Sequence, residues 1–131
     1  MKIYIAGPFF NTKERSILNT VISAIKAEFK DSELFIPMEH FIPDGENISN
    51  DEWAKAVYQM DISALETSDI VIACYLGHYS DTGTAFEIGY AIAKGIKTFL
   101  YIPDGVIDVS IMPIQACSII NKIDKNNLNQ K

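Results

Sequence analysis

The sequence predicts an α/β fold in which helices cover both faces of a parallel sheet of about five strands. Short apolar runs of strand length alternate along the chain with longer segments of helical period. One run, residues 69–75 (Asp-Ile-Val-Ile-Ala-Cys-Tyr), is almost continuously apolar, which is typical of a strand buried on both faces. Strands that alternate with helices are joined by right-handed crossovers, so we expect a three-layer sandwich.

The first half of the chain supplies two strands and two helices. Residues 2–6 form an apolar strand that stops at Gly7, and residues 34–36 form a second, shorter one. Asn11 and Glu14 have the spacing of a helix N-cap. The helix they open carries apolar residues at helical period, namely Leu18, Val21, Ile22, Ile25 and Phe29.

A long polar stretch over about residues 37–50 precedes the second helix. Loops of this length in a compact domain are often lids or binding loops. The helix starts near Asp51 and carries two neighbouring stripes. One consists of Trp53, Val57, Met60 and Ala64, and the other of Ala54, Tyr58 and Asp61.

The second half continues the alternation. We expect the buried strand at 69–75, a helix over 82–93 that ends at Lys94-Gly95, and a strand over 97–102. A weaker helix follows Met112-Pro113, and residues 118–123 form a last strand or the end of a helix. In parallel sheets ligands bind at the carboxyl ends of the strands. Three loops are expected to meet there, at residues 7–11, at 76–81 and after residue 102.

Length and charge limit the possible functions. The 131 residues suit one domain, 1–131, whose polar end, 121–131, is predicted to be a flexible tail. An apolar share of 48% supports a packed core. The net charge of −6 argues against nucleic-acid binding and against an anionic membrane surface.

Neither a metal nor a disulfide framework is predicted. Cys74 and Cys117 are interpreted as reduced core residues, since two thiols make no framework. His40 and His78 lie far apart and have no metal-ligand spacing. The apolar run at the start is too short for a signal peptide or a membrane span, so a cytoplasmic location is expected.

Glu87 is the most informative residue. It is the only charged side chain between Thr82 and Ala93, and its neighbours are apolar. A carboxylate buried without a partner is costly, so Glu87 needs hydrogen-bond partners or a chemical task. The alternative is a buried glutamate that anchors a loop. Glu87 lies about a turn and a half into a helix that begins after a strand, which places it near the expected ligand crevice.

Two further acids and several smaller residues surround this region. Asp81 precedes the helix and can serve as its N-cap, while Gly83 allows a close approach of backbone or ligand. Asp61 lies late in its helix, where a negative charge opposes the helix dipole; a plain exposed aspartate is the alternative. Two carboxylates at a crevice, one of them in apolar surroundings, suit glycosyl chemistry.

Tyr4 and Phe9 flank the turn after the first strand. Gly7-Pro-Phe-Phe is no phosphate-binding glycine motif. Aromatic side chains at that edge can stack on a planar base or simply close the core. For Tyr4, too, the alternative to a functional role is that of a half-buried core aromatic.

Three segments together resemble the nucleoside 2-deoxyribosyltransferase family, over residues 2 to about 112. They are Tyr-Ile-Ala-Gly-Pro-Phe-Phe from Tyr4, Trp-Ala-Lys-Ala-Val-Tyr-Gln-Met-Asp up to Asp61, and Asp-Thr-Gly-Thr-Ala-Phe-Glu-Ile-Gly-Tyr-Ala from Asp81. The third is the most specific, because an acid stands six residues before a Glu-aliphatic-Gly helix. The resemblance implies a flavodoxin-like (Rossmann-like) fold and base exchange on 2′-deoxynucleosides with net retention.

The resemblance also implies roles for individual residues. Glu87 matches the nucleophile that attacks C1′. Asp61 matches the acid that shuttles the base's proton, and Asp81 the residue that holds the sugar 5′-hydroxyl. Tyr4 lies close to the tyrosine that orients the nucleophile. The implied substrates are a 2′-deoxynucleoside and a free nucleobase, without a metal or organic cofactor.

The region near Ser110 departs from the family pattern. The family commonly has an asparagine two residues before a methionine, donated by a neighbouring subunit. Here the pair is Ser110 and Met112, so recognition of the 5′-hydroxyl is expected to be weaker or mediated by water. The resemblance implies a homo-oligomer, a dimer or a hexamer of dimers, whose site is completed by a neighbour.

Two other functions remain as alternatives. A 2′-deoxynucleoside 5′-monophosphate N-glycosidase has the same fold and nucleophile but places a serine where Asp81 stands. An aspartate beside a phosphate costs on the order of 1–4 kcal/mol, which favours a neutral nucleoside. A non-catalytic nucleoside- or nucleotide-sensing module is the second alternative, although a sensor needs no nucleophile.

Overall fold

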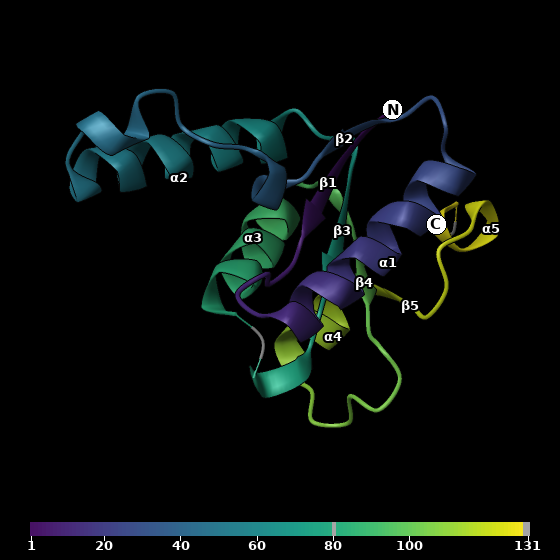
Figure 1. Ribbon diagram of the computed structural model, residues 1–131. Helices are drawn as coiled ribbons and strands as arrows, with labels where there is room; N and C mark the ends of the chain where they lie inside the picture. Colours follow the sequence, from purple (N-terminus) through teal and green to yellow (C-terminus); the bar gives the residue numbers. More distant parts are fainter. Residues whose placement is uncertain (80, 130–131) are drawn as a thin grey trace.

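The computed structural model describes residues 1–79 and 81–129, and over them it forms one parallel sheet in the order β2-β1-β3-β4-β5 (Figure 1). The strands are β1 (Lys2–Ala6), β2 (Glu33–Phe35), β3 (Ile70–Cys74), β4 (Lys97–Tyr101) and β5 (Ser118–Ile120). The α-helices are α1 (Thr12–Glu28), α2 (Asn50–Glu66), α3 (Thr82–Ala93), α4 (Ile111–Ala116) and α5 (Lys125–Leu128). Single 3₁₀ turns are η1 (Pro37–Glu39), η2 (Gly45–Asn47) and η3 (Gly77–Tyr79).

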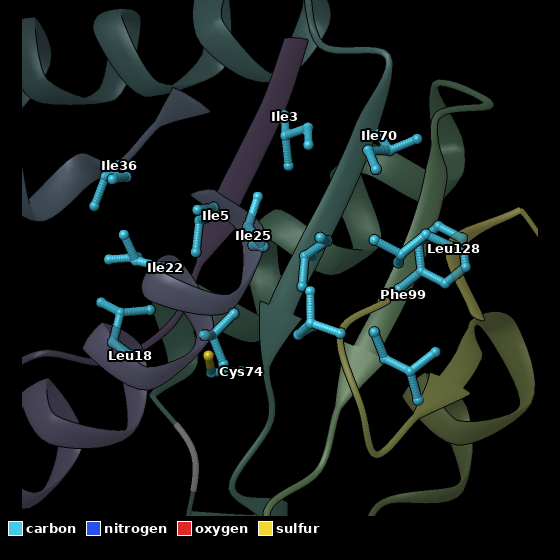
Figure 2. Close-up of a cluster of buried hydrophobic side chains, with 14 residues drawn as sticks. Ile3, Ile5, Leu18, Ile22, Ile25, Ile36, Ile70, Cys74, Phe99 and Leu128 are labelled. Atoms are coloured by element: carbon cyan, nitrogen blue, oxygen red, sulfur yellow. The ribbon is translucent and has the colours of Figure 1, made fainter. Parts of the chain in front are cut away.

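One face of the sheet packs against α1 and α5. Successive side chains of a strand point to opposite faces, so Ile3 and Ile5 of β1 lie together on this side. They meet the apolar stripe of α1, namely Leu18, Val21, Ile22 and Ile25, as Figure 2 shows in part. All four helix residues are at most 4% exposed. The stripe predicted from helical period is therefore the buried face of α1.

The opposite face is covered by α2, α3 and α4. Tyr4 and Ala6 of β1 point this way and pack with Ile88 and Ala91 of α3. Only the last turns of α2 contribute buried residues, and its first half extends beyond the sheet (Figure 1). The β-α alternation thus produces the predicted three layers, and the fold class inferred from the sequence is confirmed.

The helix starts follow from local side-chain chemistry. Asn11 Oδ1 accepts a hydrogen bond from the backbone N of Glu14 at 2.8 Å, and Glu14 Oε1 accepts one from the backbone N of Phe10 at 2.9 Å. Asn11 is thus the N-cap, as its spacing from Glu14 predicted, and Glu14 reaches back to the residue that precedes the cap. Helix α3 begins and ends where the sequence placed it, with Asp81 as its N-cap. Gly95, just after that helix, has φ = 72°, the left-handed conformation expected after a helix end.

Helix α4 begins earlier than expected, and the structure decides the type of the element that follows it, β5. Helix α4 begins at Ile111, before Pro113, because a proline in the first turn of a helix removes no intrahelical hydrogen bond. The segment 118–123, left open between strand and helix, forms β5, which pairs with β4.

Residues 123–128, predicted from the sequence to belong to a flexible tail, pack against the sheet in the structure. Ile123 and Leu128 are only 7% and 5% exposed and belong to the same apolar cluster as Phe99. Asp124 caps α5 by accepting a hydrogen bond from the backbone N of Asn127 at 2.8 Å. Two apolar residues in a polar segment give no readable period, and only the sheet brings them onto a common surface. Residues 130–131 lie outside the described part of the chain.

No helix within the described residues combines the length and the apolar character needed to cross a membrane.

Candidate active site

A cleft of about 310 Å³ opens at the carboxyl end of the sheet, between the loop after β1, the segment after β2, and helices α2 and α3. It is lined by Gly7, Phe9, Phe10, Pro37, Met38, His40, Trp53, Val57, Met60, Asp61, Asp81, Gly83 and Glu87. Six residues singled out from the sequence are therefore brought together, namely Gly7, Phe9, Asp61, Asp81, Gly83 and Glu87. The crevice lies where parallel sheets bind ligands.

Tyr4 lies in the core beside the cleft and forms a hydrogen bond with Glu87. The tyrosine is fully buried on β1, and its hydroxyl donates a hydrogen bond to Glu87 Oε2. Burial, reinforced by the nearby carboxylate of Glu87, raises the pKa of Tyr4 well above its ordinary value, so the hydroxyl keeps the proton that it donates to Glu87. A donor fixed on the central part of a sheet orients the carboxylate and favours its ionised form.

The pKa of Glu87 is raised to about 7, chiefly because burial disfavours the charged form. The hydrogen bond from Tyr4 lowers it, while the negative charges of Asp61 and Asp81 raise it further. A carboxylate with a pKa near neutrality exists in both protonation states at physiological pH. This property, together with its position in a cleft, is characteristic of functional carboxylates.

Asp61 faces the cleft with an unsatisfied oxygen. Its Oδ1 is buried, and no donor among the described residues reaches it. Burial raises the pKa of Asp61, and the positive charge available on His40 partly offsets this rise. A buried acceptor without a partner is costly, so a ligand that donates an N–H at this position would satisfy it.

Asp81 caps α3 and lines the cleft at the same time. Its Oδ2 accepts a hydrogen bond from the backbone N of Thr84 at 3.2 Å, which confirms the N-cap expected from the sequence. Gly83 permits this arrangement, because a Cβ there would lie 2.8 Å from Asp81 Oδ2. One carboxylate thus both caps the helix and lines the cleft.

A stack of three rings runs from the nucleophile candidate to the mouth of the cleft. Tyr4 and Phe35 stack with their ring centroids 5.3 Å apart, and Phe35 and His40 stack at 4.2 Å with an interplanar angle of 9°. No pattern in the sequence links these three residues, and from the sequence His40 was considered only as a possible metal ligand. The one available signal was that Phe35 and His40 flank the carboxyl end of a strand.

Ser110 and Met112 lie away from this cleft. The backbone N–H of Ser110 donates to the hydroxyl of Tyr75 at 2.8 Å, and Ser110 forms the N-cap of α4. The side chain of Met112 is 75% exposed, as is that of Ile111. Neither predicted sugar-binding residue is therefore within the cleft of a single chain.

The three loops expected to meet at the carboxyl edge do so. Residues 103–106 line a hollow of about 430 Å³ together with Asn11, Leu76 and the first turns of α1. This hollow is separate from the cleft that contains Glu87, because β4 lies beyond β3 while β2 and β1 flank the cleft. The segment after β2, which was not among the expected loops, lines the cleft instead.

Within the described residues, no group of three or more His, Cys, Asp or Glu side chains is arranged to hold a metal ion. Cys74 is buried against the core and Cys117 is half-buried, and both are free thiols. Burial raises the pKa of Cys74 to about 12, so this thiol is chemically inert.

Comparison with known families gives one match over most of the chain. The family model described as nucleoside 2-deoxyribosyltransferase matches residues 3–112. Among solved structures, a 2-deoxyribosyltransferase of Bacillus psychrosaccharolyticus superposes with a TM-score of 0.82 at 28% identity, covering 100% of this chain and 93% of that one. The CMP N-glycosidase BcmB of Clostridium botulinum shares the fold, with a TM-score of 0.62 at 18% identity over 96% of this chain and 90% of that one.

Curated relatives match over shorter segments. A nucleoside deoxyribosyltransferase of Lactobacillus johnsonii is 36% identical over 66 residues, which are 50% of this chain and 44% of that protein. One of Limosilactobacillus fermentum is 29% identical over 99 residues, 70% of this chain and 59% of that protein. The aligned segments span less than two thirds of the length of these relatives.

Proposed function

Since the chain belongs to the nucleoside 2-deoxyribosyltransferase family, we propose that it exchanges the base of 2′-deoxynucleosides through a covalent deoxyribosyl-Glu87 intermediate. The observation that carries the proposal is the buried Glu87 carboxylate, held by the Tyr4 hydroxyl in a cleft that also contains Asp61 and Asp81. A nucleophile, an acid and a polar group for the sugar thereby share one crevice of a size suited to a small molecule.

In the first half-reaction, Glu87 attacks C1′ of the nucleoside as a carboxylate. The bond between C1′ and the base nitrogen breaks, and a bond between C1′ and a Glu87 oxygen forms. The departing base needs a proton to leave as a neutral molecule, and Asp61 supplies it. Burial raises the pKa of Asp61, which keeps the proton available for this step.

The second half-reaction reverses the first with a different base. A nitrogen of the incoming base attacks C1′ from the face that the first base left, and the bond to Glu87 breaks. Asp61 takes the proton that the incoming base loses, and the Glu87 carboxylate is restored. Two inversions at C1′ give net retention of configuration. Tyr4 keeps the attacking oxygen oriented throughout.

Asp81 selects a neutral sugar end. Its Oδ2 is engaged in the cap of α3, and the carboxylate accepts the 5′-hydroxyl of the sugar as a further hydrogen bond. A 5′-phosphate at the same place would be repelled by roughly 1–4 kcal/mol at a few ångströms. The substrate is thus a nucleoside rather than a nucleotide.

A neighbouring copy of the chain completes the site around Ser110 and Met112. Support for this part of the proposal is the exposure of Ile107, Ile111 and Met112, at 90%, 75% and 75%, on one segment. Such large apolar side chains on adjacent loop and helix positions are typical of an interface between copies. Light scattering on the purified protein measures the assembly. The proposed setting is the cytoplasm, where thiols remain reduced.

The decisive experiment is a set of incubations followed by chromatography. The first contains deoxyinosine and adenine, the second deoxyinosine alone, and the third deoxyinosine 5′-phosphate. Deoxyadenosine formed in the first faster than hypoxanthine is released in the second supports base exchange. Hypoxanthine released mainly from the monophosphate identifies a nucleotide hydrolase and contradicts the role given to Asp81. Tight nucleoside binding without turnover identifies a sensing module.

Glu87→Gln tests the nucleophile in the same assay. The variant keeps an acceptor for the Tyr4 hydroxyl but cannot form the covalent intermediate, so turnover is lost while the melting profile remains cooperative. Glu33→Gln is the matched control, because Glu33 is an exposed carboxylate on β2 outside the cleft. Undiminished activity in Glu87→Gln would show that Glu87 is not the nucleophile.

A further inference from the structure

His40 has a place in the cleft that the proposed mechanism does not use. It follows η1 in the segment after β2, and its ring lines the same cleft as Asp61. The backbone N–H of His40 donates to the carbonyl of Pro37 at 3.1 Å, which closes the turn and fixes the start of the side chain. The residue is exposed, so its ring nitrogens are accessible to a bound molecule.

The plane of the imidazole is set by stacking. The His40 ring lies 4.2 Å from the ring of Phe35 and nearly parallel to it. Phe35 in turn stacks on Tyr4, which is fully buried in the sheet. A ring held in this way presents its nitrogens at its edge, in the plane of the ring, with little conformational freedom left to lose on binding.

His40 and Asp61 form a polar pair on the otherwise apolar wall of the cleft. Around them lie Trp53, Val57 and Met60, and Asp61 Oδ1 has no donor among the described residues. Both residues line the same cleft, so one flat ligand in it can approach the two side chains together. A flat heterocycle with one ring nitrogen toward Asp61 therefore presents its adjacent exocyclic group toward His40.

We propose that His40 recognises the nucleobase, by a hydrogen bond between its imidazole and the exocyclic amino or oxo group at the 6-position of a bound purine. This inference rests on the proposed function, because it assigns specificity at the same site. A neutral imidazole has one donor and one acceptor nitrogen, and its tautomer adapts to the partner. His40 thus serves 6-amino and 6-oxo purines alike, as an exchange reaction between such bases requires.

The test removes the contact from each side in turn. His40→Phe keeps a ring that stacks on Phe35 but has no nitrogen. The substrates are 2′-deoxyadenosine, 2′-deoxyinosine and purine 2′-deoxyriboside, which lacks the 6-substituent. We expect kcat/KM to fall about fivefold to tenfold in the variant for the first two, as for the loss of one hydrogen bond, and to stay unchanged for the third. His40→Gln, which retains a donor and an acceptor, is expected to recover part of the loss.

One control variant and the pattern across the three substrates make the result specific. Phe41→Leu changes the adjacent residue, which is 83% exposed and outside the cleft, and is expected to alter none of the three rates. An equal loss on all three substrates in His40→Phe would show that His40 only shapes the loop, and would overturn the inference. No loss on any substrate would overturn it as well.

A binding titration separates this inference from the proposed function. Trp53 is the only tryptophan of the chain and lines the cleft, so its fluorescence reports on a bound base. If the wild type turns over no nucleoside, the proposed function fails, but adenine and unsubstituted purine can still be compared. Weaker binding of adenine alone in His40→Phe supports the inference. Equal affinities in the two proteins, or no binding of either purine to the wild type, refute it.

Discussion

Replacing Tyr4 by phenylalanine removes a single hydroxyl, the one that donates to Glu87. The ring and its stacking on Phe35 are retained, so the packing of β1 against α3 changes little. What changes is the pKa of Glu87. The hydrogen bond from Tyr4 lowers that pKa, whereas burial and the charges of Asp61 and Asp81 raise it to about 7. Without the donor, the pKa of Glu87 rises further.

The size of the effect follows from the strength of the lost hydrogen bond. A hydrogen bond to a charged group contributes about 1.5–3 kcal/mol, which is about 1 to 2 pH units. At pH 7 the ionised fraction of Glu87 then falls from about one half to between about a tenth and about a hundredth. Because only the carboxylate attacks C1′, we expect kcat/KM at pH 7 to fall about 5-fold to 50-fold in the variant.

The assay is a pH profile of kcat/KM, which reports the free enzyme. The acidic limb of the Tyr4→Phe profile is expected to move to higher pH by about 1 to 2 units, so that the loss shrinks as the pH rises. Tyr101→Phe, a tyrosine of β4 outside the cleft, is the matched control and should leave the limb in place. A uniform loss at every pH, with an unmoved limb, would refute the view that Tyr4 tunes the ionisation of Glu87.

Three further predictions concern stability and the sugar end. Glu87→Gln should stabilise the fold by about 1–3 kcal/mol above pH 7 and by nothing near pH 4. The reason is that the pKa of Glu87 is raised from 4.5 to about 7 in the folded state. Ionisation of Glu87 therefore lowers the free energy of unfolding as the pH rises through that window. Thermal melts at pH 4, 6 and 8 measure this gain, and a constant difference would contradict it. Asp81→Ser should keep the cap of α3 but lower kcat/KM for deoxyinosine about tenfold to hundredfold, while improving use of deoxyinosine 5′-phosphate; if neither rate changes, Asp81 does not face the sugar. Leu128→Ala should destabilise the fold by about 2–4 kcal/mol in a urea titration, because this side chain is buried, whereas Asn126→Ala on the exposed side of α5 should have no effect. A loss of less than about 0.5 kcal/mol in Leu128→Ala would contradict the prediction, because it would mean that the Leu128 side chain is not packed in the core.

The sheet, the helices and the positions of the carboxylates could be predicted because their signals are local. The buried run at 69–75 needs no partner to be recognised, and the stripe of α1 repeats at the helical period. Asn11 and Asp81 act as caps through contacts three residues along the chain, so their spacing alone identified them. Glu87 stood out because it is the only charge in an apolar helix.

What the sequence could not provide were the contacts between segments distant in the chain. Phe35 and His40 approach the cleft only because β2 pairs with β1, which places their rings over Tyr4. The three loops expected at the carboxyl edge do meet, but in a hollow separate from the cleft that contains Glu87, because strand order is a property of the whole sheet. In the sequence Leu128 is an isolated apolar residue in a polar segment, whereas in the structure it belongs to the same buried cluster as Phe99.

The sequence by itself therefore determined the α/β alternation, the helix starts and the three acids that the structure brings into one cleft. The tertiary structure alone decided which segments form the cleft and that the rings of Tyr4, Phe35 and His40 stack beside it. The physical reason is the range of the interactions. Capping and periodicity act within a few residues of the chain, whereas the hydrogen bond from Tyr4 to Glu87 joins residues 83 positions apart and exists only once β1 and α3 are packed together.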